Sequence, residues 1–310
     1  MIEPLVSICC ITYNHEPFIA NAIEGFLMQK TDYPYEIIIG EDCSTDKTRD
    51  IIERYADQNP ELIKVITSDR NVGAVANECR VLTEAKGKYI AFCEGDDYWN
   101  YPGKLQRQAD FLDTNPDYSV CFHRCKHHNV ETNEWKEDHC TMFFDDNAGN
   151  GIDINTEMFF KQWITQPLTM FYRKDAFNPE IIDKYKHYRD MHLIYHLLQN
   201  GKGYLFSFLG GVHIVHNASM INKMNFLDRS IQGVNIAKEL YSAGKTALLK
   251  ENYCNMMQWA IYEISKNSFN IFNKRNPKLL LLKYALLHLL HSYDLFRFLR
   301  NIKFLFSIII

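Results

Sequence analysis

The stretch GKYIAFCEGDDYW, residues 87–99, decides how the rest of the chain is interpreted. Its apolar part, YIAFC, is short and rich in aromatic and branched residues, which predicts a buried strand. The strand leads directly into three carboxylates within four residues, Glu94, Asp96 and Asp97. Like charges this close repel each other, so a compensating cation is expected. A hard divalent metal with oxygen ligands, Mg2+ or Mn2+, is the simplest such cation.

A purely structural interpretation of the same stretch is also open. Asp is a preferred residue at helix N-termini, and the apolar spacing after Trp99 predicts a helix through Leu105 and Leu112. Asp97 could therefore cap that helix. The choice between a metal site and a cap depends on what the other strand ends carry.

Composition excludes several classes of protein. The chain has 310 residues, 46% hydrophobic and 23% charged, which is typical of a folded protein with one large or two modest domains. A net charge of -4 argues against a nucleic-acid binder. The nine cysteines, without a secretory signal, indicate reduced thiols. No apolar run reaches the roughly eighteen residues of a spanning helix. We therefore expect a cytoplasmic protein, soluble or peripheral on the inner face of the membrane.

Strands and helices alternate along the first part of the chain. Apolar runs at residues 5–12 and 35–40 predict strands, and segments with helical spacing follow them. This alternation predicts a mostly parallel sheet, in which ligands bind beyond the carboxyl ends of the strands. Thr12, Asp42 and Asp97 stand at three such ends. Three polar strand ends at one edge favour a ligand site over a cap.

Four separated motifs carry a resemblance to a known family. They are VSI…TYN at residues 6–14, EDCSTD at 41–46, NVG at 71–73, and GKYI…EGDD at 87–97. In order and spacing they resemble the family 2 glycosyltransferases of the GT-A fold, over at least residues 4–115. The resemblance implies an α/β nucleotide-sugar-binding fold with a mixed, mostly parallel central sheet flanked by helices, plus a C-terminal helical extension.

The resemblance also implies a division of the chain into three parts. Residues 1–115 would form the nucleotide-sugar-binding half of the GT-A domain. Residues 116–225 would form its acceptor-binding half, and residues 226–310 the helical extension. Many family members carry Ala-Arg-Asn in the helix after the NVG turn, where this chain has Glu78 and Cys79. Arg80 or Asn77 may be expected to substitute for the contact that this departure removes.

Roles for individual residues follow from the resemblance. Thr12 and Asp42 would contact the nucleotide base and its ribose, Asp97 would bind the divalent metal that bridges the diphosphate, and Asp96 would sit against the ribose or metal waters. The remaining donor-binding residues lie in the same motifs: Tyr13, Asn14, Glu41, Asn71 and Gly73. Mn2+ or Mg2+ is the implied cofactor.

Two residues of the second half complete the implied site. Asp190 precedes an aliphatic helix, where it could act as a helix cap. The resemblance favours a general base at this place, because inverting members use an acidic residue here to deprotonate the acceptor hydroxyl. His216, in a His-x-x-Ser pattern with Ser219, would help to hold the metal or the diphosphate. His213 is a rival for that role, and an ordinary packed His is also open.

Other features of the second half have two interpretations each. Cys121, His123, Cys125 and His127 alternate, so on a strand they share one face, where they could bind zinc or simply line the strand beside the active site. Residues 145–155 are polar and Gly-rich, which predicts a loop. Trp163 could stack on a sugar or pack in the core.

The C-terminal segment is dominantly apolar with a narrow basic stripe. Residues 278–310 could therefore form an amphipathic helix in a membrane interface, which would suit the lipid-linked acceptors of many family members. The same helix could pack on the protein's own core or in a homodimer.

The resemblance implies an inverting, metal-dependent glycosyltransferase. Its donor would be a nucleotide sugar, with UDP as the expected nucleotide, and its acceptor a hydroxyl of a glycan or lipid-linked saccharide, as in cell-surface polysaccharide synthesis. One alternative is a nucleotidyltransferase that makes the sugar nucleotide, although the Gly-rich basic loop that it would normally carry after the first strand is absent. The other is a non-catalytic nucleotide-sugar-binding scaffold, against which the joint presence of Asp42, Asp97, Asp190 and His216 argues.

Overall fold

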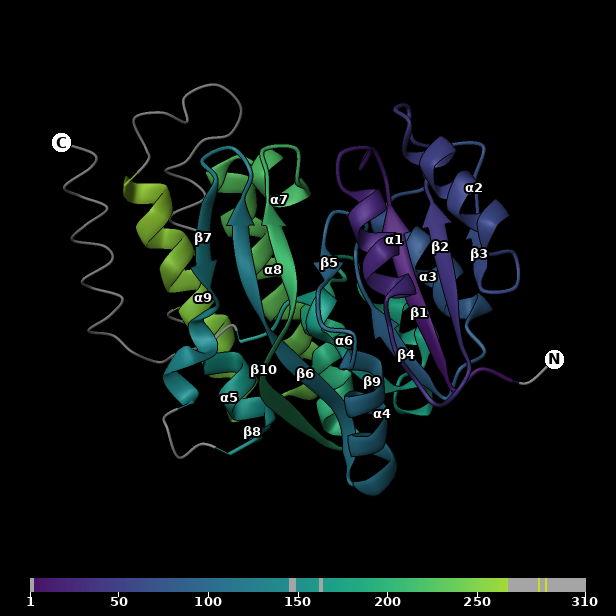
Figure 1. Ribbon diagram of the computed structural model, residues 1–310. Helices are drawn as coiled ribbons and strands as arrows, with labels where there is room; N and C mark the ends of the chain where they lie inside the picture. Colours follow the sequence, from purple (N-terminus) through teal and green to yellow (C-terminus); the bar gives the residue numbers. More distant parts are fainter. Residues whose placement is uncertain (1–2, 145–148, 162–163, 267–283, 285–287, 289–310) are drawn as a thin grey trace. The chain divides into compact units, whose positions relative to one another are not determined.

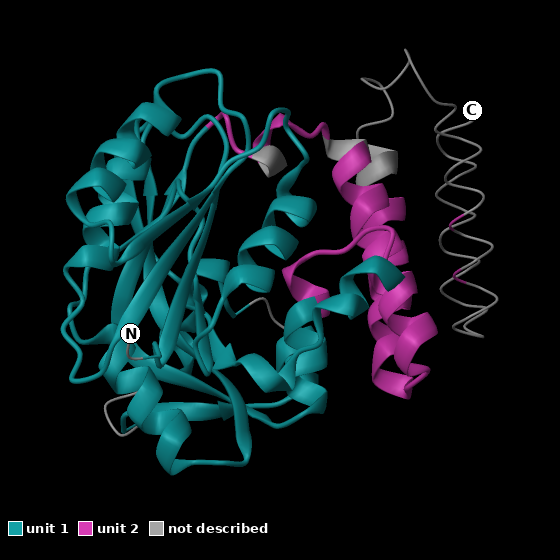
Figure 2. Cartoon of the chain, turned by 90° about the vertical axis from the view of Figure 1, so that its right-hand side faces the viewer, with its two compact units in different colours: residues 1–184, 193–216 teal, residues 185–192, 217–310 magenta. Residues whose placement is uncertain are grey.

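The structure is a computed structural model of the 310-residue chain, and it describes residues 3–144, 149–161, 164–266, 284 and 288. The chain divides into two compact units, shown in different colours in Figure 2. Unit 1 comprises residues 1–184 and 193–216, and unit 2 comprises residues 185–192 and 217–310. The three-part division at residues 115 and 225 stays a prediction.

Unit 1 begins with a parallel sheet, as the alternation predicts. Its strands are β1 (Val6–Thr12), β2 (Tyr35–Glu41), β3 (Ile63–Ile66) and β4 (Tyr89–Phe92), in the order β3-β2-β1-β4 (Figure 1). The connecting helices are α1 (Ile19–Leu27), α2 (Thr48–Gln58) and α3 (Ala74–Glu84). β1 is buried along its whole length, because helices cover both faces of a central parallel strand.

Helix α1 shows how the apolar spacing positions these layers. Ile19, Ile23 and Phe26 are buried on one face of the helix, and the Phe26 ring packs edge-on against the Trp99 ring at 4.9 Å between centroids. Gly25 lets the two backbones approach, since a Cβ there would lie 2.7 Å from the Trp99 carbonyl oxygen. The chain just after the acidic stretch is thereby fixed against α1.

The same sheet continues with strands of mixed direction. They are β5 (Tyr98–Trp99), β6 (Tyr118–Asn129), β7 (Glu134–Glu137), β8 (Gly151–Ile154), β9 (Phe171–Arg173) and β10 (Lys202–Val215). β9 lies between β4 and β6 and runs antiparallel to both, so it joins the parallel part of the sheet to the rest. This architecture confirms the predicted α/β class with a mixed sheet.

Helical segments complete unit 1 and the start of unit 2. The α-helices are α4 (Lys104–Thr114), α5 (Thr156–Lys161) and α6 (Asp190–Gln199), and the 3-10 helices are His139–Phe143, Pro167–Thr169, Lys174–Ala176 and Pro179–Lys184. The loop predicted over residues 145–155 is wrong in part, because Gly151–Ile154 pairs with β10 as strand β8. Residues 145–148 lie outside the described part of the chain, as does Trp163.

Unit 2 contains the helices α7 (Met220–Lys223), α8 (Phe226–Gly244) and α9 (Ala247–Lys266). α8 ends where Lys245 adopts a left-handed conformation with φ 51°, which confirms the helix break predicted at Gly244. Apolar side chains of α8 and α9 share a core with Tyr284.

The membrane hypothesis for residues 278–310 lies outside the described residues, apart from Tyr284 and His288, which are both buried. In the part of the chain that the structure describes, no helix combines the length and the apolar character needed to cross a bilayer. Membrane contact by this segment stays a prediction.

Lys104, at the start of α4, is a buried cation in unit 1. Its side chain is 0% exposed, and its Nζ lies 3.8 Å from the centroid of the Trp99 ring. No hydrogen-bond partner for this Nζ is found among the described residues. Burial lowers the pKa of Lys104 to about 7, because an ammonium group loses its hydration there.

The displaced pKa of Lys104 makes folding stability depend on pH. Between about pH 7 and 10.5 the unfolded chain holds a proton on Lys104 that the folded chain releases, so stability should rise with pH in this window. The slope is expected to reach about 1.4 kcal/mol per pH unit. Lys104→Met should remove this rise and be more stable than the parent chain near pH 7.

Urea unfolding followed by tryptophan fluorescence, repeated across this pH window, measures the effect. Lys86→Met is the matched control, because Lys86 is exposed and its loss should leave the pH dependence unchanged. A Lys104→Met variant that keeps the parent pH dependence would show that Lys104 is charged in the folded protein.

Candidate functional site

The carboxyl ends of β1, β2 and β4 lie at one edge of the sheet, because the three strands are parallel neighbours. After β4 ends, the acidic turn still follows β1, since Gly95 N donates to the Ile11 carbonyl at 2.9 Å. Only glycine fits at position 95, where a Cβ would lie 2.6 Å from Thr12 Oγ1. The structure therefore brings Thr12 and the Asp96–Asp97 pair together, as the motifs predict.

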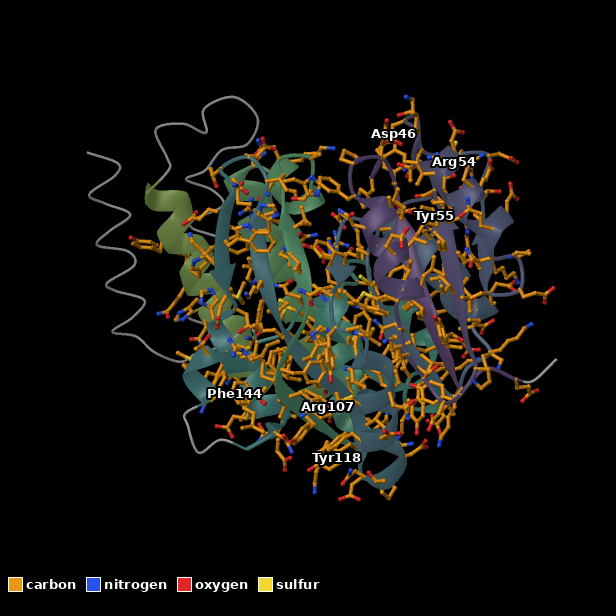
Figure 3. All side chains as sticks on the ribbon, in the orientation of Figure 1. Asp46, Arg54, Tyr55, Arg107, Tyr118 and Phe144 are labelled. Atoms are coloured by element: carbon orange, nitrogen blue, oxygen red, sulfur yellow. The ribbon has the colours of Figure 1, made fainter. Side chains whose placement is uncertain are left out.

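The turn after β1 is fixed against the loop after β2. Asn14 has φ 56°, its N–H donates to Ser44 Oγ at 3.0 Å, and its Oδ1 accepts from Thr45 N at 2.8 Å. Asp46 continues the contact by accepting from Glu16 N at 3.1 Å. In Figure 3 the label of Asp46 marks this end of the sheet, and Tyr118, where β6 begins, marks the other. Tyr13 stays exposed at this edge.

Asp42 holds the third predicted motif, the turn at residues 71–73. Its two carboxylate oxygens accept from Val72 N and Gly73 N, both at 2.8 Å. Gly73 has φ +89°, a conformation that favours glycine. Arg80 Nη1 lies 4.0 Å from Asp42 Oδ1. Each carboxylate oxygen has a second lone pair, so Asp42 can still accept a hydrogen bond from a ligand.

Two other predicted residues have a structural explanation. Glu41 is fully buried, forms an ion pair with Arg49, and accepts from Ser44 N at 2.6 Å. Asn77 donates to the Gly40 carbonyl at 2.7 Å and is buried. Of the two residues considered for the departure from the family pattern, only Arg80 thus lies beside Asp42.

Asp97 is held by β10. It is 1% exposed, both of its oxygens lie 3.1 Å from His213 Nδ1, and Oδ1 accepts from Ile214 N at 2.8 Å. The helix-cap interpretation is wrong, because β5 follows Asp97 directly. Burial raises the pKa of Asp97, and the neighbouring His213 offsets only part of that rise. Burial alone would lower the pKa of His213, but Asp97 raises it overall.

Asp96 contacts two other imidazoles. Its Oδ2 lies 3.0 Å from His216 Nε2 and 3.6 Å from His15 Nε2. Burial would raise the pKa of Asp96, but the hydrogen bond with His216 and the charge of the nearby rings lower it overall. Phe18 packs against the His216 ring at 4.7 Å. His15 was missed from the sequence, although it directly follows the TYN motif.

Asp190 belongs to unit 2 and opens α6, as predicted. Its Oδ1 accepts from Met191 N at 3.0 Å. Burial raises the pKa of Asp190 to about 6, because the hydrogen bond and the charge of Arg189 compensate only part of the lost hydration. The site-residue assignments as a whole stay predictions.

The alternating Cys and His residues lie on β6 and share one face as expected. His123 Nδ1 lies 2.8 Å from the Arg124 carbonyl oxygen, and the His127 ring lies 5.2 Å from that of His213. Among the described residues, no three His, Cys, Asp or Glu side chains gather so that they could hold a metal ion by themselves. The zinc hypothesis therefore finds no ligand set in that part of the chain.

Comparison with known proteins identifies the family. The model of "Glycosyl transferase family 2" matches residues 7–181, which is more than half of the chain. An uncharacterized Mycobacterium tuberculosis protein is 48% identical over 118 residues, 38% of this chain and 34% of that protein. The putative teichuronic acid biosynthesis glycosyltransferase TuaG of Bacillus subtilis is 37% identical over 36% of this chain and 42% of its own length.

A third relative is the Escherichia coli enzyme WfaP, named as a UDP-Glc:alpha-D-GlcNAc-diphosphoundecaprenol beta-1,3-glucosyltransferase. It is 40% identical over 36% of this chain and 42% of its own. The chain thus matches about a third to two fifths of the length of these curated relatives.

Solved structures share the fold. Staphylococcus aureus TarS 1–349 in complex with UDP-GlcNAc has a TM-score of 0.66 at 20% identity, covering 90% of this chain and 79% of that one. The mannosyltransferase PcManGT from Pyrobaculum calidifontis in complex with GDP-Man and Mn2+ has a TM-score of 0.53 at 14% identity, covering 99% and 86%. At these identities the likeness extends to the fold alone. The chain belongs to glycosyl transferase family 2 and has the GT-A fold.

Proposed function

We propose that this chain transfers a sugar from a nucleotide-sugar donor to a hydroxyl of a glycan or lipid-linked acceptor, with inversion at the anomeric carbon. The observation that carries the proposal is the Asp96–Asp97 pair, placed beside Thr12 at the carboxyl edge of the parallel strands. Ligands of such sheets bind at this edge. Family membership and the names of TuaG and WfaP support a role in cell-surface polysaccharide synthesis.

A UDP-linked donor is the form that the relatives favour, since WfaP is named for UDP-Glc and TarS was solved with UDP-GlcNAc. Asp42 would accept a hydrogen bond from the base, and the turn that it shapes, with Asn71 and Gly73, would border the nucleotide. Thr12 Oγ1 is buried and has no hydrogen-bond partner among the described residues, so it is available to the donor after a local adjustment. Tyr13 and Asn14 follow it in the same turn.

The chemistry of the Asp pair fits a divalent cation. Asp97 is a buried carboxylate whose pKa is raised by burial, so a cation beside it would relieve an unfavourable charge. We propose that Asp97 and His216 hold Mn2+ or Mg2+ with Asp96 close by. The donor diphosphate would supply the remaining ligands, because the described side chains form no complete set. When bound, the metal would neutralise the charge that develops on the departing diphosphate.

Asp190 is the proposed general base. It takes the proton of the acceptor hydroxyl while the acceptor oxygen forms a bond to the anomeric carbon from the face opposite the diphosphate. The bond between the anomeric carbon and the diphosphate oxygen breaks, and the nucleoside diphosphate leaves with the electron pair. A carboxylate whose pKa is raised to about 6 is well matched to this task near neutral pH. We further propose a cytoplasmic, membrane-peripheral location, where a lipid-linked acceptor is within reach.

Two substitutions should separate donor binding from base catalysis. Asp190→Ala should lower kcat by about 10²–10⁴-fold with little change in UDP binding, because it removes only the base. Asp97→Ala should lower kcat by a similar factor and also weaken Mn2+-dependent UDP binding. UDP release from a panel of UDP-sugars, with and without Mn2+, measures turnover, and calorimetry measures binding.

Asp190→Asn is the matched control, because it keeps the shape of the side chain and removes the base. Full activity of this variant would rule out Asp190 as the base. Formation of pyrophosphate from UTP and a sugar phosphate would instead support the nucleotidyltransferase alternative. UDP binding without any turnover would support the scaffold.

The pH dependence of catalysis should report the same carboxylate. The base acts only when deprotonated, so kcat/KM should rise with pH through a midpoint of about 6. Initial rates between about pH 5 and pH 8 at saturating metal would show it. A flat profile through this range, or an unchanged limb in the residual activity of Asp190→Asn, would contradict the assignment.

A further inference from the structure

We propose that His15 is a positioning residue that makes nucleotide binding and divalent-metal binding depend on each other. This inference rests on the proposed function, in which the turn after β1 borders the nucleotide and the Asp pair holds the metal. His15 is the residue of that turn whose side chain reaches the pair. It would transmit a change at the nucleotide to Asp96.

The backbone of His15 is tied to the nucleotide side of the site. Its N–H donates to Thr48 Oγ1 at 2.8 Å, at the start of α2. The preceding residue, Asn14, is bonded to Ser44 and Thr45 in the loop that follows Asp42. A nucleotide that orders this loop would therefore also set the position of His15.

The side chain of His15 is directed to the metal side. Its Nε2 lies 3.6 Å from Asp96 Oδ2, the same oxygen that accepts from His216 Nε2 at 3.0 Å. The two rings are perpendicular, with centroids 6.3 Å apart. One carboxylate oxygen is thus shared between the turn after β1 and the residue that follows β10, so the position of each ring affects how Asp96 is oriented.

The longer of these two contacts is the adjustable one. A separation of 3.6 Å is beyond hydrogen-bond range, whereas 3.0 Å is within it. His15 Nδ1 is buried and has no hydrogen-bond partner among the described residues, so no other bond to the ring opposes its movement. A small displacement of the turn on nucleotide binding would bring His15 Nε2 within bonding distance of Asp96 and fix the carboxylate for the metal.

Such a connection has a thermodynamic signature. If nucleotide binding improves the metal site, the metal must tighten nucleotide binding by the same factor. The protein would then bind UDP more tightly with Mn2+ than without it, partly through the direct contact of metal and diphosphate and partly through His15. Removing the His15 contact should reduce this factor without changing the affinity for UDP alone.

Calorimetric titration of UDP, with and without saturating Mn2+, tests the proposal in the parent chain and in His15→Phe, His15→Gln and Glu16→Gln. In His15→Phe the Kd for UDP alone should change less than about twofold, while the factor by which Mn2+ tightens UDP should fall by about fivefold or more. His15→Gln, whose amide nitrogen can occupy the place of Nε2, should keep an intermediate factor. Glu16→Gln, in the same turn, should behave like the parent chain.

The outcomes separate the inference from the function on which it rests. An unchanged factor in both His15 variants would overturn the role of His15, and so would an equal loss of affinity with and without Mn2+, which indicates a merely structural residue. If His15→Phe does not fold, His15→Gln decides by the same two criteria. A parent chain that binds no UDP, or whose UDP binding ignores Mn2+, would overturn the proposed function together with the inference.

Discussion

The buried carboxylate of Asp97 is the constraint on which the arrangement of the site depends. A charge that is 1% exposed needs a partner, because the low-dielectric interior gives it almost no hydration. β10 supplies that partner through His213 and the Ile214 amide. The same requirement recurs at Asp96, where His216 and His15 share one oxygen. Each acidic residue is thus compensated by a segment distant in sequence.

The sheet makes this convergence possible. β1 and β4 are parallel neighbours, so the turn after β1 and the acidic turn after β4 meet at one edge. β10 reaches the same place by pairing antiparallel with β5, at Gly211 with Trp99 and Val212 with Tyr98. Continued by one residue, this register sets His213 beside Asp97. The fixed pairing of strands, and not the local sequence, therefore determines which imidazole compensates which carboxylate.

The sequence was sufficient wherever the signal is local. The apolar runs predicted β1 to β4, the motifs predicted which side chains stand at their ends, and the acidic opening of α6 predicted Asp190 at a helix start. It was insufficient where the answer depends on long-range pairing. Asp97 could be interpreted as a helix cap until β5 was seen to follow it, and the partners of His213 and His216 depend on the register of β10.

Some residues of a predicted motif have other roles for similar reasons. Glu41 was grouped with donor-binding residues, but Arg49 and Ser44 N occupy its oxygens, because a buried carboxylate in a loop is a strong acceptor for the loop's own groups. His15 had no motif assignment, and only the fold shows its side chain beside Asp96. The motifs thus indicate where the site lies, and the contacts between distant segments decide what each residue does there.

A crystal of the protein grown with UDP and Mn2+, measured for anomalous scattering from manganese, tests the central claim most directly. The account predicts one manganese ion coordinated by Asp97 and by the diphosphate of a UDP whose base lies beside Asp42. Manganese away from Asp97, or UDP bound elsewhere than the carboxyl edge of β1, β2 and β4, would contradict it.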